Sequence, residues 1–282
     1  MTAVPLTERP ARLRRRRSGA ATNLTPASSL ALGVSVTWFS LLVLIPLTAV
    51  VVAASERGWA GYWDTVTSPQ TLAAIRLTVG QALLVTGLNV VMGTIIAWVL
   101  VRDRFRGRAV LDVVIDIPFA LPTIVAGLVL LGLYGPSSPL GLDWAYTERA
   151  VTLALAFVTL PFVVRTVQPV LGELEPDAEE AAASLGADRR TILRRVVLPA
   201  LVPAIAAGAA LSFARAIAEY GSLVLLSGNR PFDTEVVSVR VLTYVENGST
   251  ASAAAVASLM LAVALLVIVT LDIVQRRVSR RG

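Results

Sequence analysis

The chain contains no cysteine and no histidine among its 282 residues. These two absences exclude disulfides, thiol nucleophiles, Cys/His zinc sites and Ser-His-Asp triads. Lysine is absent as well, so all 25 basic residues are arginines. Because a P-loop needs its lysine at the phosphates, we do not expect the chain itself to bind or hydrolyse ATP. The sequence therefore predicts no catalytic residue and no metal site.

Charge is also scarce, at 16% of residues, whereas 55% are hydrophobic and the mean hydropathy is +0.72. A soluble domain of this length rarely has that balance. A backbone in lipid must satisfy its hydrogen bonds within each segment, so we expect an all-α membrane protein. A spanning helix needs about 20 apolar residues. Six stretches meet this requirement: 30–54, 77–101, 117–142 (apolar to about residue 134), 151–171, 196–226 and 247–271.

The arginines are distributed unevenly between the two sides of this six-span layout. Eighteen of the 25 lie on one side, in the four segments 9–17, 102–108, 189–195 and 276–281. The positive-inside rule places these segments and both termini in the cytoplasm. Residues 1–29 are expected to be an arginine-rich cytoplasmic tail near anionic lipid, not a nucleic-acid-binding arm. The first apolar run is too long for a signal peptide and is expected to be a retained span.

A polar segment interrupts the apolar chain on the predicted cytoplasmic side. It reads EEAAASLGADRRTILRRVVLPAL from Glu179 to Leu201. Proline and acidic residues at 175–177 are typical of a helix start, and Gly186 permits a left-handed turn at its end. Asp188 is positioned to cap a second helix. Composition alone leaves open an ordinary amphipathic connector.

The spacing within this segment resembles the cytoplasmic signature of ABC-importer permeases. That signature is E-A-A, three residues, G, nine residues, I, one residue, L-P. The matching positions here are Glu180, Ala181, Ala182, Gly186, Val196, Leu198 and Pro199, with valine in place of isoleucine as the one departure. The resemblance implies that the segment is a coupling helix that docks into a separate ATP-binding subunit.

The resemblance extends from about residue 35 to residue 277. The segments DIPFALPTIVAGLVLLGLYG (116–135), LAFVTLPFVVRTVQPVL (155–171) and LSFARAIAEYGSLVLLSGN (211–229) are similar to the T-type subunit of sulfate/thiosulfate permeases. Molybdate and tungstate permeases share the proline and E-A-A patterns and stay as the alternative. Ala218 stands where the family typically has glycine. The implied fold is a MetI-like ABC-importer permease bundle of six transmembrane helices: a first helix at 30–54, then a five-helix domain at 72–276 that includes the coupling loop at 172–200.

This resemblance implies the partners and the mechanism. The chain is expected in a bacterial cell membrane, beside a second homologous permease and above two ATP-binding subunits, which bind the ATP and magnesium; this chain binds no cofactor. An extracytoplasmic sulfate-binding protein is expected to deliver sulfate or thiosulfate. The polar outer loop at 227–249 is either its docking surface or a solvated connector. Alternating access then moves the anion without covalent chemistry.

Ionisable residues within spans are costly and face a bundle interior. Arg215 and Glu219 are four residues apart, so they share one helix face and form either a gate in the anion path or a structural pair. Arg165 is expected to pair or to reach the membrane surface and not to bind substrate. Pro118, Pro122 and Pro161 either bend the spans or break one, so that backbone N–H groups face an anion.

Two other classes of membrane protein are alternatives to a permease. An intramembrane hydrolase is disfavoured because histidine, cysteine and paired intramembrane aspartates are missing. A membrane scaffold would leave vesicles unable to accumulate solute even with ATP and partners present, and that observation separates it from a permease.

Overall fold

The computed structural model describes residues 25–174 and 176–279. The tail up to residue 24, with its arginines, lies outside the described residues. Within them all regular structure is helical. The helices are α1 Pro26–Phe39, a π-helical turn η1 Ser40–Leu44, α2 Ile45–Ser55, α3 Gly58–Thr67, α4 Pro69–Arg102, α5 Arg108–Ala120, α6 Thr123–Tyr134, α7 Glu148–Glu173, α8 Pro176–Ser184, α9 Arg189–Ile192, a second π-helical turn η2 Leu193–Val197, α10 Leu198–Ile217, α11 Gly221–Leu226, α12 Val237–Glu246 and α13 Thr250–Ser279.

Five continuous helical segments are long and apolar enough to cross a membrane. They are Ala27–Ser55, Pro69–Arg102, Glu148–Glu173, Arg189–Ile217 and Thr250–Arg277. A sixth crossing is reached if the bent pair α5 and α6 counts as one span. The predicted number of spans is therefore confirmed in this form, with different boundaries for the third and fifth.

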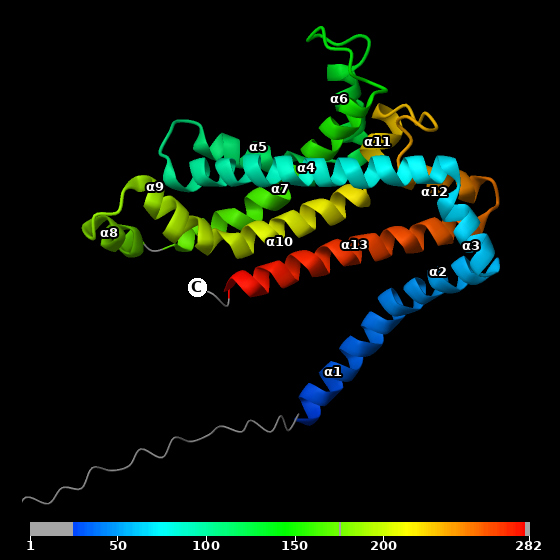
Figure 1. Cartoon of the computed structure of the whole chain (residues 1–282), viewed down its shortest axis with the longest axis horizontal. Helices are drawn as coiled ribbons and strands as arrows, with labels where there is room; N and C mark the ends of the chain where they lie inside the picture. Colours follow the sequence, from blue (N-terminus) through cyan, green and yellow to red (C-terminus); the bar gives the residue numbers. More distant parts are fainter. Residues whose placement is uncertain (1–24, 175, 280–282) are drawn as a thin grey trace, which may run out of the picture. The chain divides into compact units, whose positions relative to one another are not determined.

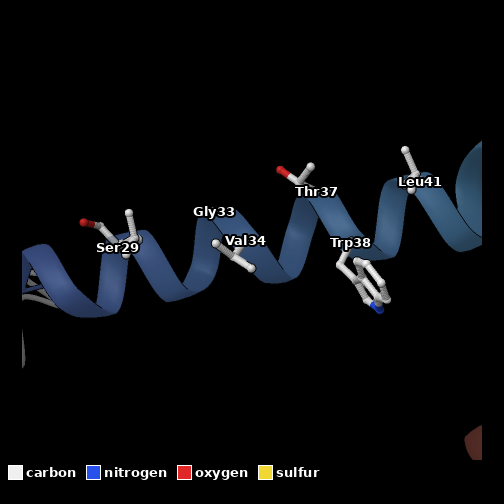
Figure 2. Close-up of a pocket in the computed structure, with 7 residues that line it drawn as sticks. Ser29, Gly33, Val34, Thr37, Trp38 and Leu41 are labelled. Atoms are coloured by element: carbon white, nitrogen blue, oxygen red, sulfur yellow. The ribbon is translucent and has the colours of Figure 1, made fainter.

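The chain forms two compact units, residues 1–48 and 49–282. The described part of the first unit is α1, η1 and the start of α2. Figure 2 shows the labelled residues from Ser29 to Leu41 spread along one helix. An open hollow of about 630 Å³ beside it has all its lining residues between Ser29 and Leu41. Because a single helix lines it, this hollow is a helix surface and not an enclosed site.

The second unit is built around α7. Figure 1 shows α4, α7, α10 and α13 running alongside one another, with α7 packed against both α4 and α10, and α13 packed on α10. Small and β-branched residues line α7 where it is buried, including Ala150, Ala154, Val163 and Val167, all at most 1% exposed. Their size lets the helices approach closely, as is common where membrane helices pack.

The third span is bent and not straight. Helices α5 and α6 meet at 115° across Leu121 and Pro122, and α6 projects away from the long helices in Figure 1. Pro122 precedes the first residue of α6 and Pro118 lies within α5. Proline lacks an N–H, so the carbonyl four residues earlier loses its helical partner. Of the two alternatives for these prolines, a break occurs at Pro122, whereas Pro118 and Pro161 stay within continuous helices.

The fifth span is shorter than predicted. We expected one helix over 196–226, but α10 ends at Ile217 and α11 begins at Gly221. The Glu219 carboxylate accepts a hydrogen bond from the Ser222 N–H at 2.8 Å. A side chain that satisfies a free N–H of the first turn favours a new helix start, so a buried acidic residue inside an apolar run ends one helix and begins another.

The two broken spans meet each other. A Cβ placed on Gly127 of α6 would lie 2.6 Å from the carbonyl oxygen of Ser222 in α11. Only glycine allows the backbones of α6 and α11 to approach this closely. The resulting α6–α11 contact joins the second half of the third span to the end of the fifth.

The outer segment at 227–249, predicted as a polar loop, is largely folded. It contains α12, which packs against α13 and α4. Val236 and Val237 are buried, as are Thr234 and Glu235. Glu235 accepts a hydrogen bond from the Gln70 side chain at 2.8 Å. Residues 234–237 are therefore core, whereas residues 230–233 and 245–248 stay exposed and remain available to a docking protein.

Candidate functional site

The polar segment after α7 folds as a short projection that we call the α8 knob, residues 176–188. Helix α8 ends at Ser184, and Gly186 follows with a left-handed φ of +85°. The Asp188 carboxylate then accepts a hydrogen bond from the Thr191 N–H at 3.0 Å and caps α9. The helix, the glycine turn and the cap all lie where the sequence predicts them.

An ion pair fixes the α8 knob to the end of α4. The Arg102 guanidinium, in the last turn of α4, binds the Glu179 carboxylate. The same guanidinium lies 5.7 Å from the ring centroid of Trp98. Both side chains of the pair are only about a quarter exposed. The α8 knob is therefore held to α4 by a side-chain contact, in addition to its chain connections to α7 and α9.

The motif residues divide into two groups. Glu180, Ala181 and Gly186 lie exposed on the α8 knob, and Ala182 is half-buried there. Glu180 lines a groove of about 530 Å³ together with Trp98, Glu179, Ala183, Arg189, Ile192, Leu193 and Val197. Leu185, which the sequence reading did not single out, is 90% exposed at the tip.

Val196, Leu198 and Pro199 are not on the α8 knob. Val196 lies in the π-helical turn η2, and Leu198 and Pro199 begin α10. The Leu198 N–H bonds back to the carbonyl of Leu193, five residues earlier. Pro199 has no N–H to offer Arg195, which explains why the wider turn is found here. These three residues lie within the spanning segment Arg189–Ile217, which follows the α8 knob in the chain.

Arg215 and Glu219 form an ion pair, with Nη2 and Oε2 2.6 Å apart. Glu219 is fully buried and its Oε1 accepts hydrogen bonds from both the N–H and the hydroxyl of Ser222, each at 2.8 Å. The Glu219 carbonyl accepts a bond from the Ser238 hydroxyl at 2.7 Å. These contacts join α10, α11 and α12, and they favour the structural interpretation of the pair over a gate in the anion path.

Arg165 of α7 makes a saturated set of contacts with α5. Its Nε and Nη2 donate to the two carboxylate oxygens of Asp116 at 2.7 and 2.6 Å. Its Nη1 donates to Asp112 Oδ1 and Gln168 Oε1, and its Nη2 also donates to the Asp112 carbonyl. We name these four residues the α5–α7 cluster. The guanidinium has five N–H donors, and five bonds are formed, so Arg165 pairs as expected and has none left for an anion.

Several of these contacts were missed from the sequence. Asp112 and Asp116 lie within α5, the first half of the bent third span, so the expectation that paired aspartates are missing from the spans is wrong. Their spacing of four residues places them on one helix face and could have indicated a shared cation. No local pattern connects Arg102 to Glu179, which are separated by 77 residues. Such a contact depends on how the chain folds back and not on spacing.

The sequence has relatives along nearly its full length. It is 43% identical to the sulfate transport system permease protein CysT of Salmonella typhimurium and 42% identical to that of Escherichia coli, each over 91% of this chain and 95% of the relative. It is 41% identical to the CysT protein of Synechococcus elongatus, over 86% of this chain and 91% of the relative.

Solved structures share the fold at lower identity. A bacterial ABC transporter that imports the acidic polysaccharide alginate contains a chain 18% identical with a TM-score of 0.73, covering 88% of this chain and 94% of that one. A chain of the MetNI methionine ABC transporter, in an inward-facing conformation, is also 18% identical, with a TM-score of 0.59 over 75% of this chain and 99% of that one. These likenesses show a common fold.

Residues 89–281 match the family described as the binding-protein-dependent transport system inner membrane component. That match covers more than half of the chain, and it includes the α8 knob and both broken spans. Together with relatives above 40% identity, it shows that the chain belongs to the family of binding-protein-dependent transport system inner membrane components.

Proposed function

We propose that the chain is the transmembrane permease subunit of an ATP-driven importer that carries sulfate and thiosulfate into the cell. The observation that carries this proposal is the identity of 42–43% to sulfate permeases over 91% of the chain. The molybdate and tungstate alternative has no comparable support among these relatives. The chain supplies a path and a mechanical connection, whereas ATP and magnesium are bound by separate subunits.

The α8 knob is the proposed contact with an ATP-binding subunit. Glu180 and Ala181 are exposed there, and Leu185 places an apolar side chain at the tip. A protruding apolar group flanked by small residues fits a groove on a partner, and Glu180 is available to pair with a cation of that partner. Closure of two ATP-binding subunits would then displace the α8 knob, and this displacement would move η2 and α10.

The assembly that follows has four further components. A second, homologous permease would complete the path, two ATPases would bind the α8 knobs, and an extracytoplasmic sulfate-binding protein would deliver the anion. The arginine asymmetry supports placing both termini on the cytoplasmic side of a bacterial cell membrane. No step requires a covalent bond to substrate, so the subunit is proposed to act without enzymatic chemistry.

Uptake of labelled sulfate by a bacterial strain that lacks its own T-type permease tests the substrate. We expect expression of this chain, with its natural partner subunits, to restore uptake. Excess unlabelled thiosulfate should compete, and excess molybdate should not. Restored uptake that molybdate suppresses more strongly than thiosulfate would assign the chain to the molybdate class instead.

Cross-linking tests the proposed contact with the ATPase. Because the chain has no cysteine, Ala183→Cys introduces a single thiol on the α8 knob. It should cross-link to a thiol placed on the ATP-binding subunit of the assembled complex. Val245→Cys, an exposed position in α12, is the control and should not cross-link. Equal cross-linking at both positions, or none from Ala183→Cys, would contradict the contact.

A further inference from the structure

Helix α3 lies where the chain passes from one span to the next. The first spanning segment ends at Ser55 and the second begins at Pro69, so α3 lies at a membrane surface between them. Helix α4 follows α3 directly, and Arg102 in its last turn binds the α8 knob. Helix α3 is therefore at the membrane surface opposite the α8 knob. Figure 1 shows it crossing the end of α13 to reach α4.

Three aromatic side chains, which we call the aromatic flank, lie along one side of α3: Trp59, Tyr62 and Trp63. The Trp59 ring stacks on those of Tyr62 and Trp63, with centroids 5.7 and 6.1 Å apart. Trp59 and Trp63 are nevertheless 76% and 55% exposed. At about 100° per residue the aromatic flank covers one arc of about 100°, whereas the exposed Arg57 and Asp64 lie about 150–170° from its centre. Helix α3 therefore has an aromatic side and a charged side.

The aromatic flank faces the interior of the membrane. Trp59 and Tyr62 line an open hollow of about 380 Å³ together with Val51 of α2 and Ser258 of α13. Val51 lies four residues before the end of α2, and Ser258 lies eight residues after the start of α13. At about 1.5 Å per residue these positions are about 6 and 12 Å inside the ends of their spans. The hollow is therefore on the membrane side of α3.

The charged side of α3 is held nearer the membrane surface. Arg57 Nη1 donates to the Ser252 hydroxyl at 3.0 Å, two residues after α13 begins at Thr250. On the aromatic side, the Ser258 hydroxyl donates to the Tyr62 hydroxyl at 3.5 Å, more than a turn deeper along α13. The two contacts fix the rotation of α3 about its axis, with its charged side toward water.

An exposed tryptophan pair at this level is typical of contact with lipid. Tryptophan and tyrosine are enriched at membrane–water interfaces, because their rings are apolar and their N–H or O–H groups are polar. The hollow beneath the aromatic flank is lined by Val51, Ala54 and ring carbons, with one serine hydroxyl at Ser258. Such a lining fits a hydrocarbon chain and offers little to a charged ligand.

We propose that the aromatic flank rests in the bilayer surface and that an acyl chain of a membrane phospholipid fills the hollow beneath it. The bound lipid then fixes α3, and with it the junction between the first span and the second, at the boundary between lipid and water. This placement requires only that the chain resides in a membrane, and it does not depend on the solute carried.

Nitroxide spin labels test the depth of the aromatic flank. The protein is the complete transporter in liposomes, with cysteine-free partner subunits. A label on Trp63→Cys should collide more often with oxygen, which concentrates in lipid, than with a water-soluble nickel chelate. A label on Asp64→Cys, the next residue and on the charged side, is the matched control and should show the reverse preference.

Two results would overturn this depth. Nickel collisions as frequent at Trp63→Cys as at Asp64→Cys would mean that water covers the aromatic flank. Exclusion of both reagents from Trp63→Cys would mean that protein covers it, and the protein would be a partner subunit if the isolated chain stays accessible. Neither result bears on sulfate transport, which the uptake experiment decides separately.

A photoreactive phospholipid tests the hollow. With a diazirine in its acyl chain, the lipid should cross-link to Trp59 or Tyr62 in the complete transporter. Because the chain has no lysine, trypsin cuts after Arg57 and Arg76 and releases residues 58–76 as one peptide. Mass spectrometry of that peptide measures the adduct, and its absence from the wild-type chain would overturn the lipid site.

Filling the hollow with protein should remove the lipid. Val51 lines the hollow and is 56% exposed, so Val51→Trp adds a ring there without disturbing the core. We expect several-fold less adduct in this variant. Val52→Trp, at the neighbouring position that is 57% exposed and outside the lining, is the matched control and should keep the adduct. Equal amounts of adduct in the two variants would contradict an acyl chain in the hollow.

Discussion

A single buried carboxylate determines how the fifth span ends. Glu219 binds Arg215 on one oxygen and Ser222 on the other, and its own carbonyl receives the Ser238 hydroxyl. Each contact reaches a different helix, so the break between α10 and α11 is held from three directions. Arg215 is thereby paired with a buried carboxylate within the fold.

We expect Glu219→Gln to lower the free energy of unfolding by about 2 kcal/mol, the scale of a hydrogen bond to a charged group. The amide oxygen keeps the bonds from Ser222, but the partly buried Arg215 loses its counter-charge. Thermal unfolding of the detergent-solubilised chain measures the effect. Glu246→Gln, at an exposed position, is the control; equal melting of both variants would contradict the structural role of Glu219.

The Arg102–Glu179 pair is the second residue contact with a measurable consequence. Arg102→Ala and Glu179→Ala should each reduce sulfate uptake while ATP hydrolysis continues, because the α8 knob loses its connection to α4. A double-mutant cycle on stability should give a coupling energy of about 1 kcal/mol for this partly exposed pair. We expect uptake to be restored when the two charges are exchanged. Unreduced uptake in both single variants would contradict the connection.

At the residue scale, the sequence predicted only the contacts between residues that are close together in the chain. Asp188 capping, the left-handed Gly186 and the Arg215–Glu219 spacing all depend on residues within four positions of one another. The contacts of Arg102 with Glu179 and of Arg165 with α5 join residues separated by 77 and about 50 positions. Chain folding decides such pairs. The spacing of Asp112 and Asp116 could have indicated a shared cation, but no local pattern identifies Arg165 as that cation or connects Arg102 to Glu179.

At the scale of elements, the third and fifth spans are both broken, for a shared physical reason. The sequence left open whether Pro122 bends or breaks the third span, and it predicted the fifth span as one helix. Hydropathy measures how apolar a segment is and contains no information on the direction of its helix axis. The segments 117–134 and 196–226 were therefore each predicted to be one span. Pro122 breaks the first and Glu219 breaks the second. Both residues were visible in the sequence, but whether they bend or break a helix depends on the partners that satisfy the freed backbone groups.

The contact between the broken spans gives a prediction on packing. Gly127→Ala would place a methyl group 2.6 Å from the Ser222 carbonyl oxygen. Because this oxygen belongs to the backbone of α11, it cannot rotate away as a side chain can. We expect a loss of about 1–3 kcal/mol in stability. Gly132→Ala in the same helix meets no atom within 4 Å and should be neutral or slightly stabilising. Equal stability of the two variants would contradict the α6–α11 contact.

The start of α9 should be sensitive to acid. Hydrogen bonds from the Thr191 side chain and N–H hold the pKa of Asp188 below its ordinary value of 3.8. A lowered pKa means that the stabilisation is present above the unfolded value and is lost as the pH falls through the folded one. Amide exchange at 189–192 should therefore accelerate below about pH 4. In Asp188→Asn, which caps without titrating, this acceleration should be absent; its persistence would contradict the assignment to Asp188.

At the scale of the whole molecule, composition decided the class of fold and an extended motif decided the family. The absence of lysine, cysteine and histidine removed most alternatives, and the arginine distribution indicated an orientation. The motif from Glu180 to Pro199 was informative because its positions are distributed over a turn, a helix cap and the start of a span.

In the proposed mechanism, the ATP-binding subunits displace the α8 knob, and η2 transmits this displacement to α10. Gly186 supports this geometry because a φ of +85° is closed to proline, whose ring fixes φ near −65°. Gly186→Pro should therefore displace the α8 knob without altering the spans. Glu180→Lys should act similarly by reversing the charge presented to the partner.

The ratio of sulfate imported to ATP hydrolysed, in proteoliposomes of the complete transporter, tests coupling through the α8 knob most directly. For Gly186→Pro and Glu180→Lys we predict that ATP hydrolysis persists while the ratio falls toward zero, with Glu246→Lys at the unaltered ratio as the control. An unchanged ratio in both α8 knob variants would contradict the account.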